Sequence, residues 1–217
     1  MRTLLFLLLL ISSLNSSLNA VPISALNTDC QSGKMPSCMT LGNFFSDTAS
    51  GLKDLALAKS YYLRACDLGH HFACLQASVR MASFDADGVA KGCGLGYGPA
   101  CAKLAEYLDD MNSDRNIILY VYNQALRFNE QGCAKDDAIS CKSLAALRSE
   151  GPLKDTDKAL DAHQRGCELK DASSCFALVG IYKQSGLSNK AQQSLDTACE
   201  LGLDEACASN FAKKDRE

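Results

Sequence analysis

The sequence has no strong excess of charge, and it contains only one long apolar run. Its 22 basic and 25 acidic residues give a formal net charge of −3. This balance offers no attraction for nucleic acid or for an anionic membrane, so we expect neither as a partner. The apolar run lies at the start of the chain, and no second run of membrane-spanning length follows it. We therefore expect a soluble, monomeric mature protein without stable membrane insertion.

Several motifs of catalysis and cofactor binding are also missing. The sequence has no C-x-x-C for thiol exchange, no C-x-x-C-H for haem attachment and no glycine-rich phosphate loop. Its three histidines are His70 and His71, which lie between paired cysteines, and His163, which lies on a predicted helix. They do not show the spacing of a ligand set. We therefore expect no cofactor and no metal site.

Residues 1–20 have the three parts of a secretory signal peptide. Arg2 gives a positive n-region, Leu4–Ile11 an apolar core, and Ser12–Ala20 a polar region that ends in Leu-Asn-Ala. The core is too short to cross a bilayer, which takes a helix of about 20 residues. Cleavage at the end of this region would leave 21 basic and 25 acidic residues, a net charge of about −4. We expect residues 21–217 to be exported, either to the periplasm or out of the cell.

What the sequence does have is a repeated pair of cysteines. All twelve cysteines fall into six pairs with seven residues between the partners: Cys30/Cys38, Cys66/Cys74, Cys93/Cys101, Cys133/Cys141, Cys167/Cys175 and Cys199/Cys207. Eight residues of continuous helix would separate the two Cα atoms by about 12 Å, whereas a disulfide needs them within about 7 Å. The chain must therefore reverse inside each pair, and a glycine such as Gly69 can end the first helix in a left-handed conformation. Each pair predicts a disulfide across a helical hairpin.

Zinc binding is the alternative use of paired cysteines. Structural zinc sites place two to four residues between paired cysteines, whereas seven stand between them here. An even number of cysteines at a fixed spacing in an exported chain is instead typical of structural disulfides. We therefore predict six disulfides and no free thiol.

The cysteine pairs mark an array of about five to six repeats of uneven length. The first cysteines of successive pairs are 36, 27, 40, 34 and 32 residues apart. The interval between Cys66 and Cys93 is the shortest, and glycines are dense from Gly88 to Gly98. Two interpretations are open for this segment: a degenerate repeat whose second helix has frayed, or a bend that exposes Tyr97 to a partner.

The repeat is most complete in Ala58–Cys74, AKSYYLRACDLGHHFAC. Its alanine, aromatic, cysteine and glycine positions resemble the Sel-one-like (Sel1-like) repeat in its cysteine-rich form, that of the Helicobacter cysteine-rich protein (Hcp) beta-lactamase family. The resemblance implies an all-α fold, an α/α superhelical solenoid related to tetratricopeptide arrays. It also implies partner binding or peptide binding, and some family members carry a beta-lactamase or penicillin-binding label. Asp136 and Lys170 stand where the family pattern has glycine, so we expect those two hairpins to close differently.

The beta-lactamase label can be compared with the residues. Serine beta-lactamases combine S-x-x-K with S-D-N and K-T-G, because the nucleophile needs an adjacent base and an oxyanion site. This chain has one S-x-x-K, Ser50–Lys53, and neither of the other motifs. Roughly one such match is expected by chance in a chain of this composition. We therefore assign no catalytic residue, and a weak beta-lactam-hydrolysing or penicillin-binding enzyme remains the alternative hypothesis.

The leading hypothesis is a protein that binds a protein or peptide partner. Every repeat of a solenoid presents the same face to the same side, so the helices after the second cysteines can form one long concave groove. Aromatic and arginine side chains supply much of the binding energy of such interfaces. The candidate contact residues are Arg80, Tyr97, Tyr107, Arg148 and Tyr182.

Overall fold

The computed structural model describes residues 22–79 and 84–214 of the chain. The predicted signal peptide and Arg80 lie outside these ranges. Within them the chain forms α-helices, one 3-10 helix and connecting turns, with no strand. The elements are α2 (Ile23–Gln31), α3 (Met35–Ser46), η1 (Thr48–Ser50), α4 (Leu55–Asp67), α5 (His71–Val79), α6 (Ala86–Gly94), α7 (Gly98–Asp110), α8 (Arg115–Cys133), α9 (Ala138–Glu150), α10 (Thr156–Glu168), α11 (Ala172–Gln184), α12 (Ser188–Glu200) and α13 (Asp204–Lys214). The prediction of an all-α fold is confirmed.

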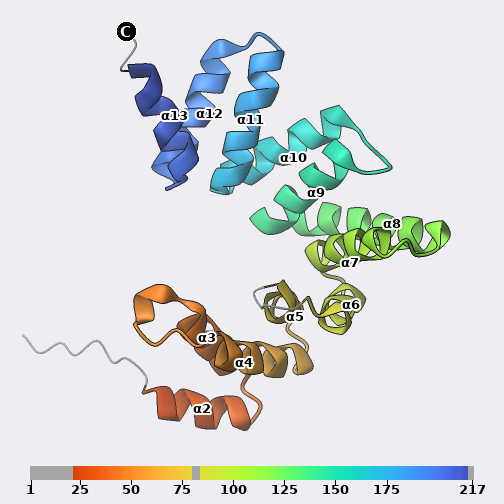
Figure 1. The fold of residues 1–217 in the computed structure, drawn as a ribbon, viewed down its shortest axis with the longest axis vertical. Coiled ribbons are helices and arrows are strands. Elements are labelled where there is room, and N and C mark those ends of the chain that lie inside the picture. The colour runs from red at the N-terminus through yellow and green to blue at the C-terminus, as the bar shows by residue number, and fades with distance from the viewer. Residues whose placement is uncertain (1–21, 80–83, 215–217) are drawn as a thin grey trace, which may run out of the picture.

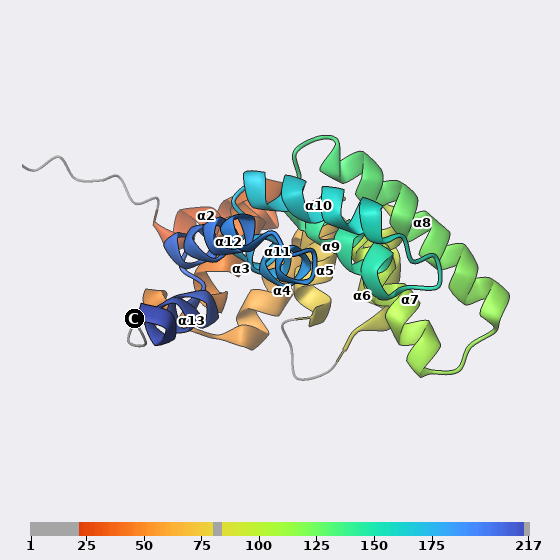
Figure 2. The same ribbon diagram turned by 90° about the horizontal axis from the view of Figure 1, so that it is seen from above.

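The helices form one curved row, with α2 at one end and α13 at the other (Figures 1 and 2). Each helix packs against the helix before it and the helix after it in the sequence. The buried apolar residues are divided among four clusters along the row, which include Tyr62, Val89, Leu126 and Leu178 respectively. A core that is spread along a row of helix pairs is the architecture of an α/α solenoid.

Six disulfides join successive helices: Cys30–Cys38, Cys66–Cys74, Cys93–Cys101, Cys133–Cys141, Cys167–Cys175 and Cys199–Cys207. The paired Cα atoms are 4.5 to 4.7 Å apart. The first cysteine of each pair lies at the end of one helix and the second in the first turn of the next. We call α3, α5, α7, α9, α11 and α13 the second-cysteine helices, and the turns inside the pairs the stapled turns. No cysteine of the described chain is free, and the predicted pairing is confirmed.

The second cysteines of the pairs lie in the core of the array. Five of the six have an exposed fraction of 0%: Cys38, Cys74, Cys101, Cys141 and Cys175. The spacing of the cysteines predicted their pairing but not this burial, because burial depends on the neighbouring helices. No partner or substrate can contact these side chains at the surface. These five second cysteines are therefore structural residues of the core.

One backbone geometry closes all six stapled turns. The residue after the left-handed position donates its backbone N–H to the carbonyl of the residue before the first cysteine, at 2.9 to 3.1 Å. Glycine takes the left-handed position in four turns, with φ between 83° and 93°. Asp136 and Lys170 take it in the other two, with φ of 65° and 69°. The prediction that these two hairpins close differently is therefore wrong, because the disulfide and the backbone bond hold the residue there despite a cost of about 1–2 kcal/mol.

The glycine-dense segment is more helical than predicted. Asp85 caps α6 by accepting a hydrogen bond from the backbone nitrogen of Gly88 at 3.1 Å, and the helix runs without a break to Gly94. The expectation of a frayed helix is therefore wrong. The alternative of an exposed Tyr97 is wrong as well, because this residue is only 6% exposed. The glycines permit close packing instead: a Cβ atom on Gly98 would overlap the backbone nitrogen of Asn129 in α8.

Small residues before the cysteines let the stapled helices approach each other. A Cβ atom on Gly132 would overlap the hydroxyl oxygen of Ser140, and these residues precede the first and second cysteines of one pair. At Gly166, in the next pair, a Cβ atom would meet Ser174 at 2.5 Å. The short Cα–Cα distance that a disulfide imposes therefore explains why both positions carry small residues.

Candidate functional site

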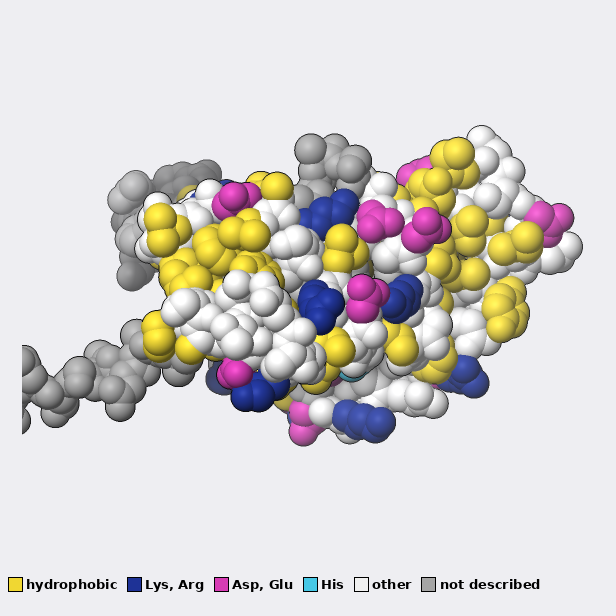
Figure 3. Space-filling view, turned by 90° about the horizontal axis from the view of Figure 1, so that it is seen from below, with side chains coloured by type: hydrophobic (Ala, Val, Ile, Leu, Met, Phe, Trp, Pro, Cys, Tyr) yellow, Lys and Arg dark blue, Asp and Glu magenta, His cyan; other side chains and the backbone are white. Residues whose placement is uncertain are grey.

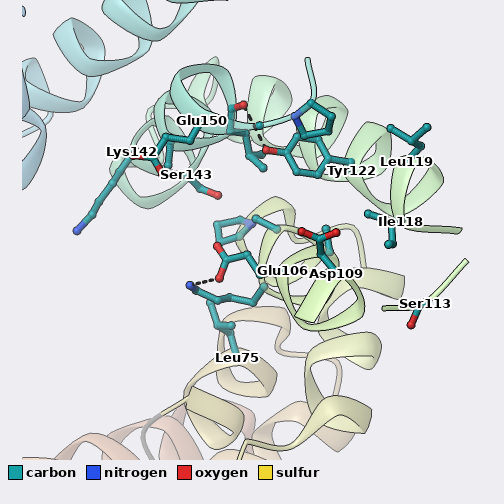
Figure 4. Close-up of a pocket in the computed structure, with 18 of the residues that line it drawn as sticks. Leu75, Glu106, Asp109, Ser113, Ile118, Leu119, Tyr122, Lys142, Ser143 and Glu150 are labelled. Atoms are coloured by element: carbon teal, nitrogen blue, oxygen red, sulfur yellow. Dashed lines mark hydrogen bonds and ion pairs between the residues drawn. The ribbon is translucent and has the colours of Figure 1, made fainter. Parts of the chain in front are cut away.

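A groove of about 1120 Å³ opens in the middle of the array. Its walls come from the second-cysteine helices α5, α7 and α9 and from the first half of α8. The α7–α8 loop and the α9–α10 loop contribute to its rim. Figure 4 shows the lining side chains of α7 and those of α8 and α9 on opposite sides of the open space. The groove therefore lies where several repeats present the same face.

Alanines belong to the groove lining. Ala102 and Ala105 of α7 are buried and Ala146 of α9 is exposed, and their short side chains leave room beside the helices. Ile139 adds a larger apolar side chain that is 41% exposed. Covering such surface favours binding by about 25 cal/mol per Å².

Tyr122 of α8 reaches across the groove to α9 (Figure 4). Its hydroxyl donates a hydrogen bond to the carbonyl oxygen of Leu147 at 3.3 Å. Gly151 makes this reach possible, because a Cβ atom there would overlap the tyrosine hydroxyl. The tyrosine ring is half-buried, so part of it stays open to an occupant of the groove.

Three exposed carboxylates lie around Tyr122. Glu106 and Asp109 come from α7, and Glu150 comes from the end of α9 (Figure 4). The pKa of Tyr122 is raised mainly by burial, and the charges of Glu106, Glu150 and Asp109 raise it further. The Arg148 guanidinium acts in the opposite direction. The electrostatic field at the tyrosine is therefore negative.

Two lysines of the groove lining already have partners. The Nζ atom of Lys103 pairs with Glu106 at 2.5 Å. The Nζ atom of Lys142 donates to the hydroxyl of Ser173 in α11 at 3.0 Å, across to the next second-cysteine helix. Neither lysine pairs with the other carboxylates of the groove.

Asp109 and Glu150 are the carboxylates of this part of the groove that form no ion pair with another described residue. The remaining cation of the lining, Arg115, is the first residue of α8. It lies seven residues before Tyr122 on the same helix, which is about 10 Å along the axis. Asp109 and Glu150 thus have no ion-pair partner among the described residues, although the Arg148 guanidinium also acts on the tyrosine.

Two of the partner-contact residues predicted from the sequence are buried and pack against other residues of the chain. Tyr97 is 6% exposed, and its ring centroid lies 4.7 Å from that of His71. Tyr182 is 8% exposed, and its hydroxyl accepts a hydrogen bond from Gln164 at 2.9 Å. Burial leaves both tyrosines little area for contact with a partner.

The other two described candidates also contact their own chain. Tyr107 is half-buried and stacks on Phe84, with 4.9 Å between the ring centroids. Arg148 pairs with Glu130 of α8 at 2.8 Å and donates to the carbonyl of Leu153 at 3.3 Å. None of the four described candidates is among the residues that line the groove. Their role in partner binding stays a prediction.

The sequence does contain a signal for the groove residues. Positions two and five after the second cysteine line the groove in two successive repeats: Lys103, Glu106, Ser143 and Ala146. The sequence analysis selected aromatic and arginine residues because they dominate many interfaces. In this array the selected tyrosines and Arg148 contact their own chain, whereas small and charged residues take these two positions in the groove lining.

The alternative catalytic residue lies in a local turn. The hydroxyl of Ser50 donates to the backbone carbonyl of Asp47 at 2.8 Å and accepts from the backbone nitrogen of Leu52 at 3.2 Å.

Among the described residues, no three His, Cys, Asp or Glu side chains gather as metal ligands would. None of the described helices is long and apolar enough to cross a membrane.

A second apolar surface lies at the end of the array that α2–α4 form. Figure 3 views the molecule from this end, and hydrophobic side chains gather over these helices. The exposed large apolar residues of this part of the chain are Ile23, Leu52 and Leu55. The end of a solenoid leaves uncovered the face on which a further repeat would pack.

The comparisons with known proteins find the fold and nothing more specific. No family model matches the sequence, and no curated protein is detectably similar to it. A Sel1 repeat protein from Oxalobacter formigenes is 18% identical, with a TM-score of 0.59 over 81% of this chain and 75% of that one. A putative Sel1 repeat protein from Klebsiella pneumoniae is 16% identical, with a TM-score of 0.55 over 87% of this chain and 97% of that one.

An immunity protein from Pseudomonas aeruginosa is a further structural neighbour, 15% identical with a TM-score of 0.54 over 82% of this chain and 73% of that one. At such identities the likeness concerns the fold alone. Together with the six disulfides, it confirms the predicted solenoid of cysteine-rich Sel1-like repeats. Membership of the Hcp beta-lactamase family itself stays a prediction.

Proposed function

We propose that this protein binds a peptide segment of a protein partner in the groove between α7 and α9. The observation that carries the proposal is the groove of about 1120 Å³, whose lining comes from three second-cysteine helices. Pockets for small molecules have volumes of about 300–1,000 Å³ and enclose most of the ligand. The volume of this groove lies slightly above that range. Its size therefore favours a chain segment over a small molecule.

The dimensions of the groove suit a short extended peptide. Neighbouring packed helices are about 10 Å apart, so an occupant that contacts α5, α7 and α9 spans about 20 Å. Six residues of extended chain cover about that length. The lining offers alanine surface for apolar side chains and the polar groups of Asn112, Ser113 and Ser143 for the peptide backbone. A peptide thus finds both kinds of contact that it needs.

We also infer that the protein acts outside the cytoplasm. Six structural disulfides support this inference, because such bonds persist in oxidising compartments and are rare in the cytosol. The signal-peptide pattern of residues 1–20 is the second support. N-terminal sequencing of the mature protein should find Val21 as its first residue. A mature protein that begins at Met1 would contradict the inference.

The test of the proposed function uses a displayed library of random peptides and a groove-filling variant. Ala146 lines the groove and is exposed, so Ala146→Trp fills part of the space without burying the new ring in the core. Ala90→Trp is the matched control, because Ala90 is also exposed but lies on α6 and is not part of the groove lining. Peptides are enriched on the wild-type protein and their affinities are measured for all three proteins.

We expect the enriched peptides to bind Ala146→Trp at least about tenfold more weakly, and Ala90→Trp within about twofold of the wild type. Melting temperatures of the three proteins check that the folds are equivalent. If no peptide is enriched, or if the enriched peptides bind both tryptophan variants equally well, the proposed function is wrong.

A further inference from the structure

The groove has an uneven distribution of charge. Around Tyr122 the nearby charges are the carboxylates of Glu106, Asp109 and Glu150 and the guanidinium of Arg148. Glu106 is balanced by Lys103 at 2.5 Å, and Arg148 is bound to Glu130, a residue outside the lining, at 2.8 Å. Asp109 of α7 and Glu150 of α9 have no such ion-pair partner, and they lie one on each side of the tyrosine (Figure 4).

These two carboxylates do not serve the fold in any way that the described contacts show. Asp109 lies near the end of α7, and Glu150 is the last residue of α9. A negative charge at a helix C-terminus is unfavourable, because the helix dipole is negative at that end. Neither carboxylate caps a helix or forms an ion pair within the described chain. Their position in the groove is better explained by an occupant that brings a positive charge.

We propose that the peptide bound in this groove places a lysine or arginine side chain over Tyr122, between Asp109 and Glu150. This inference rests on the proposed function and adds the chemical class of the partner: a segment with a basic residue flanked by small apolar residues. Carboxylates on two sides hold the cationic head with charge-assisted hydrogen bonds. The face of the tyrosine ring attracts the same head.

The rest of the lining suits the remainder of such a side chain. Long basic side chains carry an apolar stem that packs on apolar surface while the head stays with its polar partners. Ile139 and Ala146 of α9 are exposed in the groove lining and offer such surface. Two basic residues of the groove lining do not occupy the position over Tyr122. Lys142 is bound to Ser173 at 3.0 Å, and Arg115 is the first residue of α8, about two turns before the tyrosine.

The test uses the peptides enriched on the wild-type protein and removes the charge from either side. Each peptide is made in an arginine form and in a form with citrulline, which keeps the shape and loses the charge. The protein variant is Asp109→Asn with Glu150→Gln. Its matched control is Asp87→Asn with Asp161→Asn, two exposed aspartates of α6 and α10 that form no ion pair with a described residue.

We expect lysine or arginine to be enriched at one peptide position, and citrulline to weaken binding to the wild-type protein at least about tenfold. The arginine-to-citrulline ratio should fall to about twofold in the groove variant and stay near the wild-type value in the control variant. Substitution of exposed carboxylates by their amides preserves side-chain shape, and equal melting temperatures confirm that both variants are folded.

The outcomes separate this inference from the function on which it rests. If no peptide is enriched, the proposed function fails. If peptides are enriched without a basic residue, or if citrulline binds as well as arginine, the basic-residue inference is overturned and peptide binding stands. An unchanged ratio in the groove variant also overturns it. A wild-type dimer in sedimentation that Ala146→Trp dissociates would assign the groove to a second copy of the chain and overturn it as well.

Discussion

At the stapled turns one geometry is repeated six times, whereas the groove lies in the middle of the array, where neighbouring repeats differ. The paired Cα atoms of the turns vary only from 4.5 to 4.7 Å, although the turns contain Gly, Asp or Lys at the left-handed position. The groove lies beside α8, which has 19 residues against 13 in α4, α10 and α12. The loop that follows α9 contains Gly151 and Pro152, and both belong to the lining.

The difference shows how this chain separates stability from binding. The stapled turns fix how each helix meets the next, and they tolerate changes of side chain because the constraint is covalent. The groove depends on a few close contacts, such as that between Tyr122 and Gly151, which no disulfide supports. Changes at the turns should therefore alter stability, and changes at the groove should alter binding with a smaller effect on stability.

The largest effect on stability should come from removing a disulfide in the middle of the array. Closing so short a loop stabilises a protein by about 2–3 kcal/mol in the chain-entropy model. Replacing Cys133 and Cys141 by alanine should cost at least that much, because both flanking interfaces weaken. The same change at Cys199 and Cys207 should cost less, since that pair is at the end of the array. Denaturant unfolding of both variants measures the difference, and equal losses would indicate one globular core.

The next effect should come from Gly151→Ala in the groove. The new Cβ atom would overlap the Tyr122 hydroxyl, so the tyrosine must move and its hydrogen bond to Leu147 is lost. We expect a loss of about 1–3 kcal/mol in the free energy of unfolding, together with weaker peptide binding. Gly180→Ala is the matched control, because nothing lies within 4 Å of a Cβ atom there. Unchanged binding by Gly151→Ala would show that Tyr122 does not shape the site.

A smaller effect, of opposite sign, should follow Lys170→Gly at a stapled turn. Lys170 has φ of 69°, and a glycine relieves the strain of its side chain. We expect a gain of about 0.5–1 kcal/mol in stability, measured by denaturant unfolding, with no change in peptide binding. Asp136→Gly should gain less, because it also removes the ion pair with Arg165. A loss of stability in Lys170→Gly would mean that its side chain makes a contact of its own.

The smallest effect concerns pH. Burial is the main cause that lowers the pKa of His163 in α10 and of His70 in a stapled turn. Asp171 opposes the shift at His163, and the charge of His71 adds to it at His70. A histidine with a lowered pKa binds fewer protons when folded, so stability falls as pH drops below about 6.5. Unfolding at pH 7.5 and 5.5 should show a smaller fall in His163→Gln than in the wild type; an equal fall would contradict the shift.

Much of the fold could be predicted from particular residues. The spacing of Cys66 and Cys74 requires a chain reversal, and Gly69 provides it with φ of 93°. The sequence was less informative at Asp136 and Lys170, because propensity alone disfavours a left-handed residue with a side chain. At these two positions the disulfide and the backbone hydrogen bond determine the conformation. They hold Asp136 and Lys170 in the left-handed conformation that glycine takes in the other turns.

By itself the sequence determined the helical hairpins, the disulfide pairing and the repeated row, because these follow from local spacing and covalent geometry. The tertiary structure decided where the groove opens and which large side chains are buried. Tyr97 and Tyr182 are buried by helices that lie next to them in space, whereas Ala146 and Glu150 remain open. The groove itself lies beside the long helix α8, at the approach of Tyr122 to Gly151. The distances between helices are set by their packing, and the periodicity of residues along one helix does not predict them.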